Sequence, residues 1–234
     1  MKEPTTDTPI VYTWPQQLLR IAAKLISALF NPLLIPSYML LMLVIVNPYL
    51  FGVSSLNEQP VQILLLRVFV STFFIPLFSI MMLRFTGLLS NLAMLDSKDR
   101  IAPYIITGVF YLWLFRNFYG NPTIPAAYTV FMLGATIALF LAFFINIFSR
   151  ISAHTVGMGV LVGMVLITMW QFSYDTFMLG TWSLNMNIIL IVALLVAGMV
   201  GTARQLLHPI IPTDLYGGYA IGVFAQFIAL RFII

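Results

Sequence analysis

The sequence contains no cysteine and very little charge. The absence of cysteine excludes disulfides, thiolate metal sites and cysteine nucleophiles, although it identifies no compartment. Only 8% of the 234 residues are charged, whereas roughly 25% are charged in soluble domains, and 61% are hydrophobic. A chain with so few charges cannot cover a surface that faces water. We therefore interpret it as an integral membrane protein.

Long apolar runs occupy most of the chain after its first helix. They reach the about 20 residues that a helix needs to cross a hydrocarbon core roughly 30 Å thick, and they lack the strict alternation of an outer-membrane strand. We predict an all-α, polytopic transmembrane helix bundle of six to seven spans, formed by 33–234 as one domain. The spans are predicted at about 33–51, 62–83, 101–119, 127–148, 155–174, 186–203 and 216–233. Residues 175–185, which include Trp182, are predicted to form a loop.

The N-terminal part of the chain has a different pattern. Residues 1–14 form a polar tail without the features of a cleaved signal peptide, so we expect the internal spans to direct targeting. In 15–30, apolar residues recur at helical spacing while Arg20 and Lys24 lie on another face, which is typical of an amphipathic helix in the membrane interface. The Asn31–Pro32 dipeptide is predicted to end this helix. The alternative is one long bent helix that continues into the first span.

Three groups of polar residues follow the second, fourth and sixth predicted spans: Lys98 and Arg100; Ser152 and His154; Arg204, His208 and Asp214. Because an even number of crossings separates the groups, we expect them on one side of the membrane, where ionisable groups indicate a functional site. Arginines and histidines with one carboxylate and no cysteine fit an oxyanion, phosphate above all, better than a metal ion. We therefore expect neither a metal ion nor another cofactor here. Alternatively, the arginines are positive-inside anchors, and His208 and Asp214 only end and cap helices.

The order of these groups resembles the motifs of the type 2 phosphatidic acid phosphatase family. That family has a motif of Lys, six residues and Arg-Pro, then Pro-Ser-Gly-His, then Ser-Arg, five residues, His, three residues and Asp. The matching residues, in the same order, are Arg100 near Pro103, Ser152 with His154, and Arg204 with Asp214. The resemblance covers about 96–222 and is strongest to the hydrophobic, loop-poor members found in Bacteroidetes.

The chain departs from the family pattern at several positions. The first-motif lysine position is Ala93, with Lys98 as a substitute, and Ile151 replaces the second-motif proline. The position of the family's nucleophilic histidine is Ile210, and the nearest histidine, His208, comes two residues earlier.

The resemblance implies a role for each candidate residue. His208 would be a displaced nucleophile, Asp214 would orient it, and His154 would protonate the leaving oxygen. The phosphate oxygens would be bound by Arg100, Arg204, Ser152 and Lys98. The substrate would be a lipid phosphate or a polyprenyl diphosphate, and the location would be a bacterial inner membrane.

Two hypotheses remain open at this point. The first is an active lipid-phosphate or polyprenyl-diphosphate phosphatase. The second, motivated by Ile210, is a catalytically silent protein that binds lipid phosphate or serves as an accessory subunit of a larger membrane complex. A transporter has little support because the spans show no evident repeat. The sequence has no nucleic-acid-binding signature, and its net charge of +4 is small.

Overall fold

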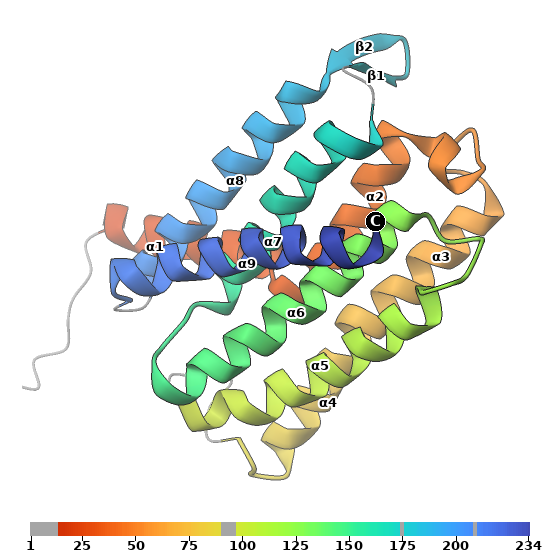
Figure 1. The fold of residues 1–234 in the computed structure, drawn as a ribbon. Helices are drawn as coiled ribbons and strands as arrows, with labels where there is room; N and C mark the ends of the chain where they lie inside the picture. The colour runs from red at the N-terminus through yellow and green to blue at the C-terminus, as the bar shows by residue number, and fades with distance from the viewer. Residues whose placement is uncertain (1–13, 90–96, 174–175, 208–209) are drawn as a thin grey trace, which may run out of the picture.

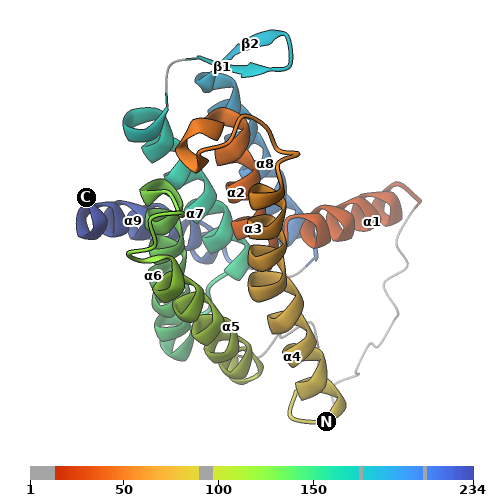
Figure 2. The ribbon, with the colours of Figure 1, turned by 90° about the vertical axis from the view of Figure 1, so that its right-hand side faces the viewer.

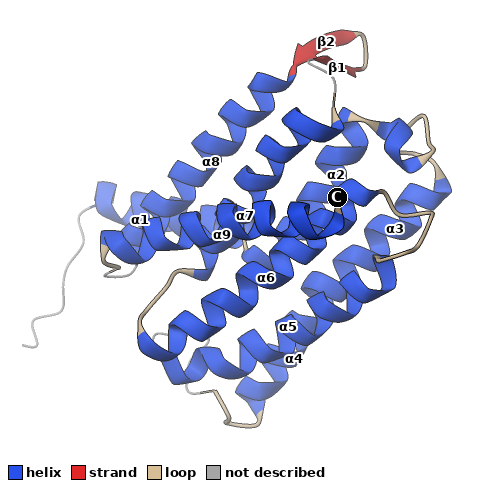
Figure 3. Ribbon diagram, in the orientation of Figure 1, coloured by secondary structure: helices blue, strands red, loops and turns tan. Residues whose placement is uncertain are grey.

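The computed structural model describes residues 14–89, 97–173, 176–207 and 210–234, which are largely helical (Figure 3). Six helical stretches of this part are long and apolar enough to cross a membrane: Trp14–Val46, Gln59–Phe85, Ala126–Phe148, Ala153–Phe172, Met186–Leu207 and Pro212–Ile233. The predicted all-α, polytopic fold class is therefore confirmed.

The first of these stretches consists of two helices that point in different directions. Helix α1 spans Trp14–Leu29, a short 3-10 helix covers Pro32–Leu34, and α2 spans Ile35–Val46. Figure 2 shows α1 running sideways out of the bundle, whereas α2 lies within it. The bend has a local cause, because Asn31 Oδ1 accepts a hydrogen bond from the Leu33 backbone N–H at 3.0 Å and Pro32 begins the 3-10 turn. The chain therefore bends at the predicted dipeptide, Asn31–Pro32, within one helical stretch, and the placement of α1 in the membrane interface stays a prediction.

The next stretch is interrupted by a π-helix. After a 3-10 turn at Pro48–Phe51, helix α3 (Gln59–Phe69) passes through a π-helix, η3 (Val70–Phe74), into α4 (Ile75–Phe85). Pro76 explains the wide turn, because proline cannot donate a backbone hydrogen bond and its ring clashes with the carbonyl of residue i−4, here Thr72.

Helix α5 (Ser97–Phe118) lies beside α4 and α6 (Figure 1). It is as long as the spanning stretches but is not one of the six. It carries Asp99 in its first turn and Arg116 in its last. It begins earlier than predicted, so Arg100 lies inside the helix and not before it.

The remaining helices include the most closely packed pairs of the described structure. They are α6 (Ala126–Phe148), α7 (Ala153–Ile167), α8 (Met186–Leu207) and α9 (Pro212–Ile233), and a π-helix at Thr168–Phe172 continues α7. Helix α9 lies across α6 and α7 (Figure 1). Glycines allow this approach: a Cβ atom on Gly159 of α7 would meet the backbone of Tyr219, and one on Gly222 of α9 would meet the backbone of Val160. The middle of α7 is thereby held against the first half of α9.

The predicted loop 175–185 is wrong for most of its length. Strands β1 (Thr176–Leu179) and β2 (Trp182–Asn185) form an antiparallel hairpin beyond the N-terminus of α8 (Figure 3). The two strands are joined by a tight turn in which Gly180 has a φ of 63°. Phe177 is buried against Val46 and Met186, which gives this short hairpin an apolar anchor.

Candidate functional site

Polar side chains from four helices come together at one end of the bundle, where α5 and α7 begin and α8 ends. We call this group the polar cluster and define it as Ser27 of α1, Arg100 of α5, Ser152 and His154 at the start of α7, and Arg204 in the last turn of α8. The cluster thus contains one member or more from each of the three sequence groups.

Ser27 connects two of the other members. Its Oγ accepts a hydrogen bond from Arg204 Nη1 at 3.3 Å. Nε2 of His154 lies 3.1 Å from Ser27 Oγ and 3.1 Å from the Ser27 carbonyl oxygen. A carbonyl oxygen only accepts, so this second hydrogen bond requires a proton on Nε2 of His154. The contacts fix the histidine ring against α1.

Arg100 fixes the chain that leads into α7. Its Nη1 donates a hydrogen bond to the Ile151 carbonyl oxygen at 3.2 Å. The positive charges of Arg100 and Arg204 also repel each other. The cluster therefore concentrates positive charge.

Ser152 occupies the position before the first turn of α7 and is 7% exposed. A serine at this position usually accepts a hydrogen bond from a backbone N–H of the first turn, but here the side chain makes no capping bond. Its Oγ is buried and has no hydrogen-bond partner among the described residues. The N-terminal end of α7, which carries a partial positive charge, thus presents an unused hydroxyl.

Arg204 is half-buried and has no counter-ion in the described part of the chain. Among the described residues its side chain forms one hydrogen bond, to the neutral Ser27 hydroxyl, and its Nε is buried without a partner there. An uncompensated charge away from water is costly, and this cost falls when an anion binds.

An apolar groove of about 450 Å³ lies between α1 and α8, next to the polar cluster. Its walls include Ala23, one turn before Ser27, and Ala203, which precedes Arg204. No charged side chain lines it. The groove therefore joins an apolar surface to a cationic end.

The other predicted site residues take no part in these hydrogen bonds or lie outside the described residues. Lys98 is exposed in the first turn of α5. Asp214 lies in the first turn of α9, and its side chain forms no hydrogen bond or ion pair with any described residue. His208 lies outside the described residues, so its role as a nucleophile stays a prediction. Ile210, at the family's histidine position, is half-buried just before α9.

Sequence reasoning missed Ser27. The available signal was its place four residues after Ala23, which puts two small side chains on one face of this amphipathic helix. Both residues are buried, while Leu18, Leu25 and other large residues of α1 point outward.

No family model matches the chain, and no curated protein or solved structure is significantly similar to it.

Proposed function

We propose that this membrane protein binds the phosphate group of a lipid at the polar cluster. The observation that carries the proposal is Arg204, a half-buried guanidinium that has no counter-ion among the described residues and whose Nε is buried without a partner. Guanidinium groups bind phosphate oxygens through paired, charge-assisted hydrogen bonds. A phosphate at this position would supply the missing acceptor and the missing negative charge.

Other members of the cluster suit the same ligand. Ser152 offers a buried hydroxyl without a partner at the N-terminus of α7. Arg100 adds a second positive charge, and an anion would offset its repulsion of Arg204. Without a ligand, Ser27 Oγ accepts a hydrogen bond from Arg204. A bound phosphate oxygen would either replace Ser27 Oγ as the acceptor or accept a second hydrogen bond from the same guanidinium group.

The ligand is a lipid because of the groove beside the cluster. An acyl or polyprenyl chain would lie in the apolar groove between α1 and α8 while its phosphate reaches Arg204. Each buried methylene contributes about 0.8 kcal/mol, so the chain would dominate affinity and the cluster would select the headgroup. A lipid monophosphate and a polyprenyl diphosphate both have this chemistry.

Hydrolysis of the bound lipid phosphate is the second candidate, and the presence of His154 in the cluster favours it. In this reading His208 would attack phosphorus, His154 would give a proton to the leaving lipid oxygen, and water would then release phosphate from the histidine. Asp214 would orient His208. Ile210, at the family's nucleophile position, motivates the alternative of a silent binder or an accessory subunit of a membrane complex.

The test compares a short-chain phosphatidic acid with the matching diacylglycerol in detergent. We expect the phosphate lipid to bind more tightly, and Arg204→Gln to lower its affinity about ten- to a hundred-fold, because a hydrogen bond to a charged group contributes about 1.5–3 kcal/mol. Arg231→Gln, at the exposed far end of α9, is the control and should bind normally. Equal affinity for the two lipids would contradict the proposal.

The same preparations test hydrolysis. Release of inorganic phosphate that is lost in His154→Asn would establish the phosphatase, and binding without release would leave the silent binder. Polyprenyl diphosphate is assayed in parallel to identify the lipid class.

A further inference from the structure

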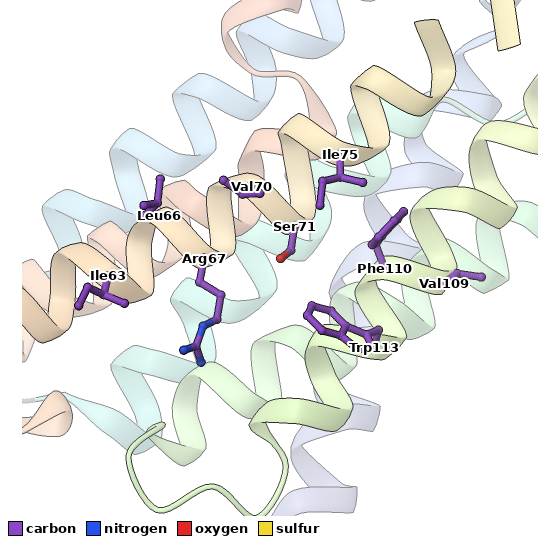
Figure 4. A pocket seen from close by; sticks show the side chains of 9 residues that line it. All are labelled: Ile63, Leu66, Arg67, Val70, Ser71, Ile75, Val109, Phe110 and Trp113. Atoms are coloured by element: carbon purple, nitrogen blue, oxygen red, sulfur yellow. The ribbon is translucent and has the colours of Figure 1, made fainter. Parts of the chain in front are cut away.

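A second groove lies at a different place, between the α3–η3–α4 stretch and α5 (Figure 4). It has a volume of about 580 Å³. Its lining is apolar except for Arg67 and Ser71, and it opens outward, since Val109 is 58% and Trp113 54% exposed. In a membrane protein such an outward-facing groove meets lipid.

Arg67 is the unusual residue of this groove. It lies eight residues after Gln59, the start of α3, which corresponds to about 12 Å along the helix. Its side chain is exposed and has no hydrogen-bond or ion-pair partner in the described part of the chain. Figure 4 shows it extending from α3 into the space toward α5, where Trp113 faces it.

An ionisable residue inside a spanning helix is costly and indicates function unless it is paired. Arginine reduces this cost when its long side chain reaches the headgroup level, and the phosphate of an anionic lipid is the partner found there. A tryptophan beside it fits the same depth, because tryptophan is enriched at membrane interfaces.

The groove is separate from the polar cluster. Trp113 lies 13 residues after Arg100 on the same helix, which corresponds to about 20 Å. One wall of the groove is formed in part by Val70 and Ser71 of the π-helix η3, which begins three residues after Arg67.

We propose that this groove is a binding site for one anionic membrane lipid, whose phosphate pairs with Arg67 and whose acyl chain lies along Val70, Ile75, Val109 and Phe110. Charge complementarity selects the headgroup, because Arg67 supplies the only charge in the lining. The site is a structural lipid site and requires no activity at the polar cluster.

Trp113 reports directly on occupancy of the groove. In a variant with Trp14, Trp170 and Trp182 replaced by phenylalanine, Trp113 is the only tryptophan left. Brominated phosphatidylglycerol and brominated phosphatidylcholine, each mixed into an unbrominated bilayer, then quench its fluorescence according to how often they occupy the groove. We expect an about five-fold preference for phosphatidylglycerol, since one arginine near the surface contributes about 1 kcal/mol toward an anionic lipid.

Arg67→Gln should abolish this preference and leave quenching by phosphatidylcholine unchanged. The matched control is Arg116→Gln, an exposed arginine in the last turn of α5 that does not line the groove, and it should retain the preference. Equal quenching by the two lipids in the parent protein, or a preference that survives Arg67→Gln, overturns the proposal.

A second measurement does not depend on removing tryptophans. Native mass spectrometry of the full chain, extracted in mild detergent, should show one retained anionic lipid that Arg67→Gln loses and Arg116→Gln keeps. Retention by Arg67→Gln, or a carboxylate-bearing protein partner in place of the lipid, contradicts the assignment.

Discussion

The packing of α7 against α9 gives the sharpest prediction about stability, because it depends on backbone atoms. A Cβ atom on Gly222 would lie 2.5 Å from the Val160 nitrogen and 2.7 Å from the Gly159 carbonyl carbon. Backbone atoms of a helix cannot rotate away as a side chain does, so Gly222→Ala must push the two helices apart by roughly 1 Å to restore ordinary van der Waals contact.

The expected cost follows from two opposing effects. Overpacking costs about 1–3 kcal/mol, and this contact lies at the upper end because the three obstructing atoms, which include the Val156 carbonyl oxygen, are all main-chain atoms. Alanine contributes about 1 kcal/mol more than glycine to helix formation. We therefore expect Gly222→Ala to lower the free energy of unfolding by about 2 kcal/mol.

Gly217 provides a matched control on the same helix. A Cβ atom there would have no neighbour within 4 Å, so Gly217→Ala should keep the helix-propensity gain of up to about 1 kcal/mol. Equilibrium unfolding of both variants in mixed micelles, followed by circular dichroism, measures the difference. If Gly222→Ala proves as stable as Gly217→Ala, the close contact between α7 and α9 is not what the structure describes.

Two further predictions concern buried polar atoms. Tyr104 Oη is buried without a partner among the described residues, so Tyr104→Phe should leave stability unchanged or raise it. Tyr128→Phe should cost about 1–2 kcal/mol, because Tyr128 donates a hydrogen bond to the Pro36 carbonyl oxygen at 3.0 Å. The same unfolding assay compares the two variants, and an equal loss of stability in both would contradict this reasoning. Ser27→Ala should destabilise the lipid-free protein by about 1–3 kcal/mol, because Arg204 loses its acceptor, and by less when a phosphate lipid is bound. Thermal unfolding with and without the lipid checks this, and an equal loss in both states would argue against a ligand at Arg204.

Local chemistry made some boundaries predictable from the sequence. The end of α1 follows from Asn31 and Pro32 alone, since one caps the next turn and the other cannot continue a helix. The hairpin had a signal too, the Gly180–Thr181 pair between two short apolar runs, but four-residue strands are too short to show alternation.

The site was predictable only where it depends on counting crossings. That count needs the number of spans and no tertiary detail, so it predicted that the three groups share one side of the membrane, but not which of their residues would come together. The count of crossings could not identify Ser27 as a site residue, and periodicity shows that α1 is amphipathic but not which face packs against α8. Nor could it predict that the Ser152 hydroxyl makes no capping bond, which depends on the geometry of the turn.

The hydrogen bond between Ser27 and Arg204 joins residues 177 positions apart, and this separation sets an order of events during biosynthesis. Ser27 is made early, His154 much later, and Arg204 after nearly all of the spanning helices. Because a growing chain enters the membrane from its N-terminus, α1 is present before α8 and lacks its packing partner until α8 is inserted. A nascent chain that stops before α8 would carry Ser27, Arg100 and His154 into the membrane without the arginine that completes the polar cluster.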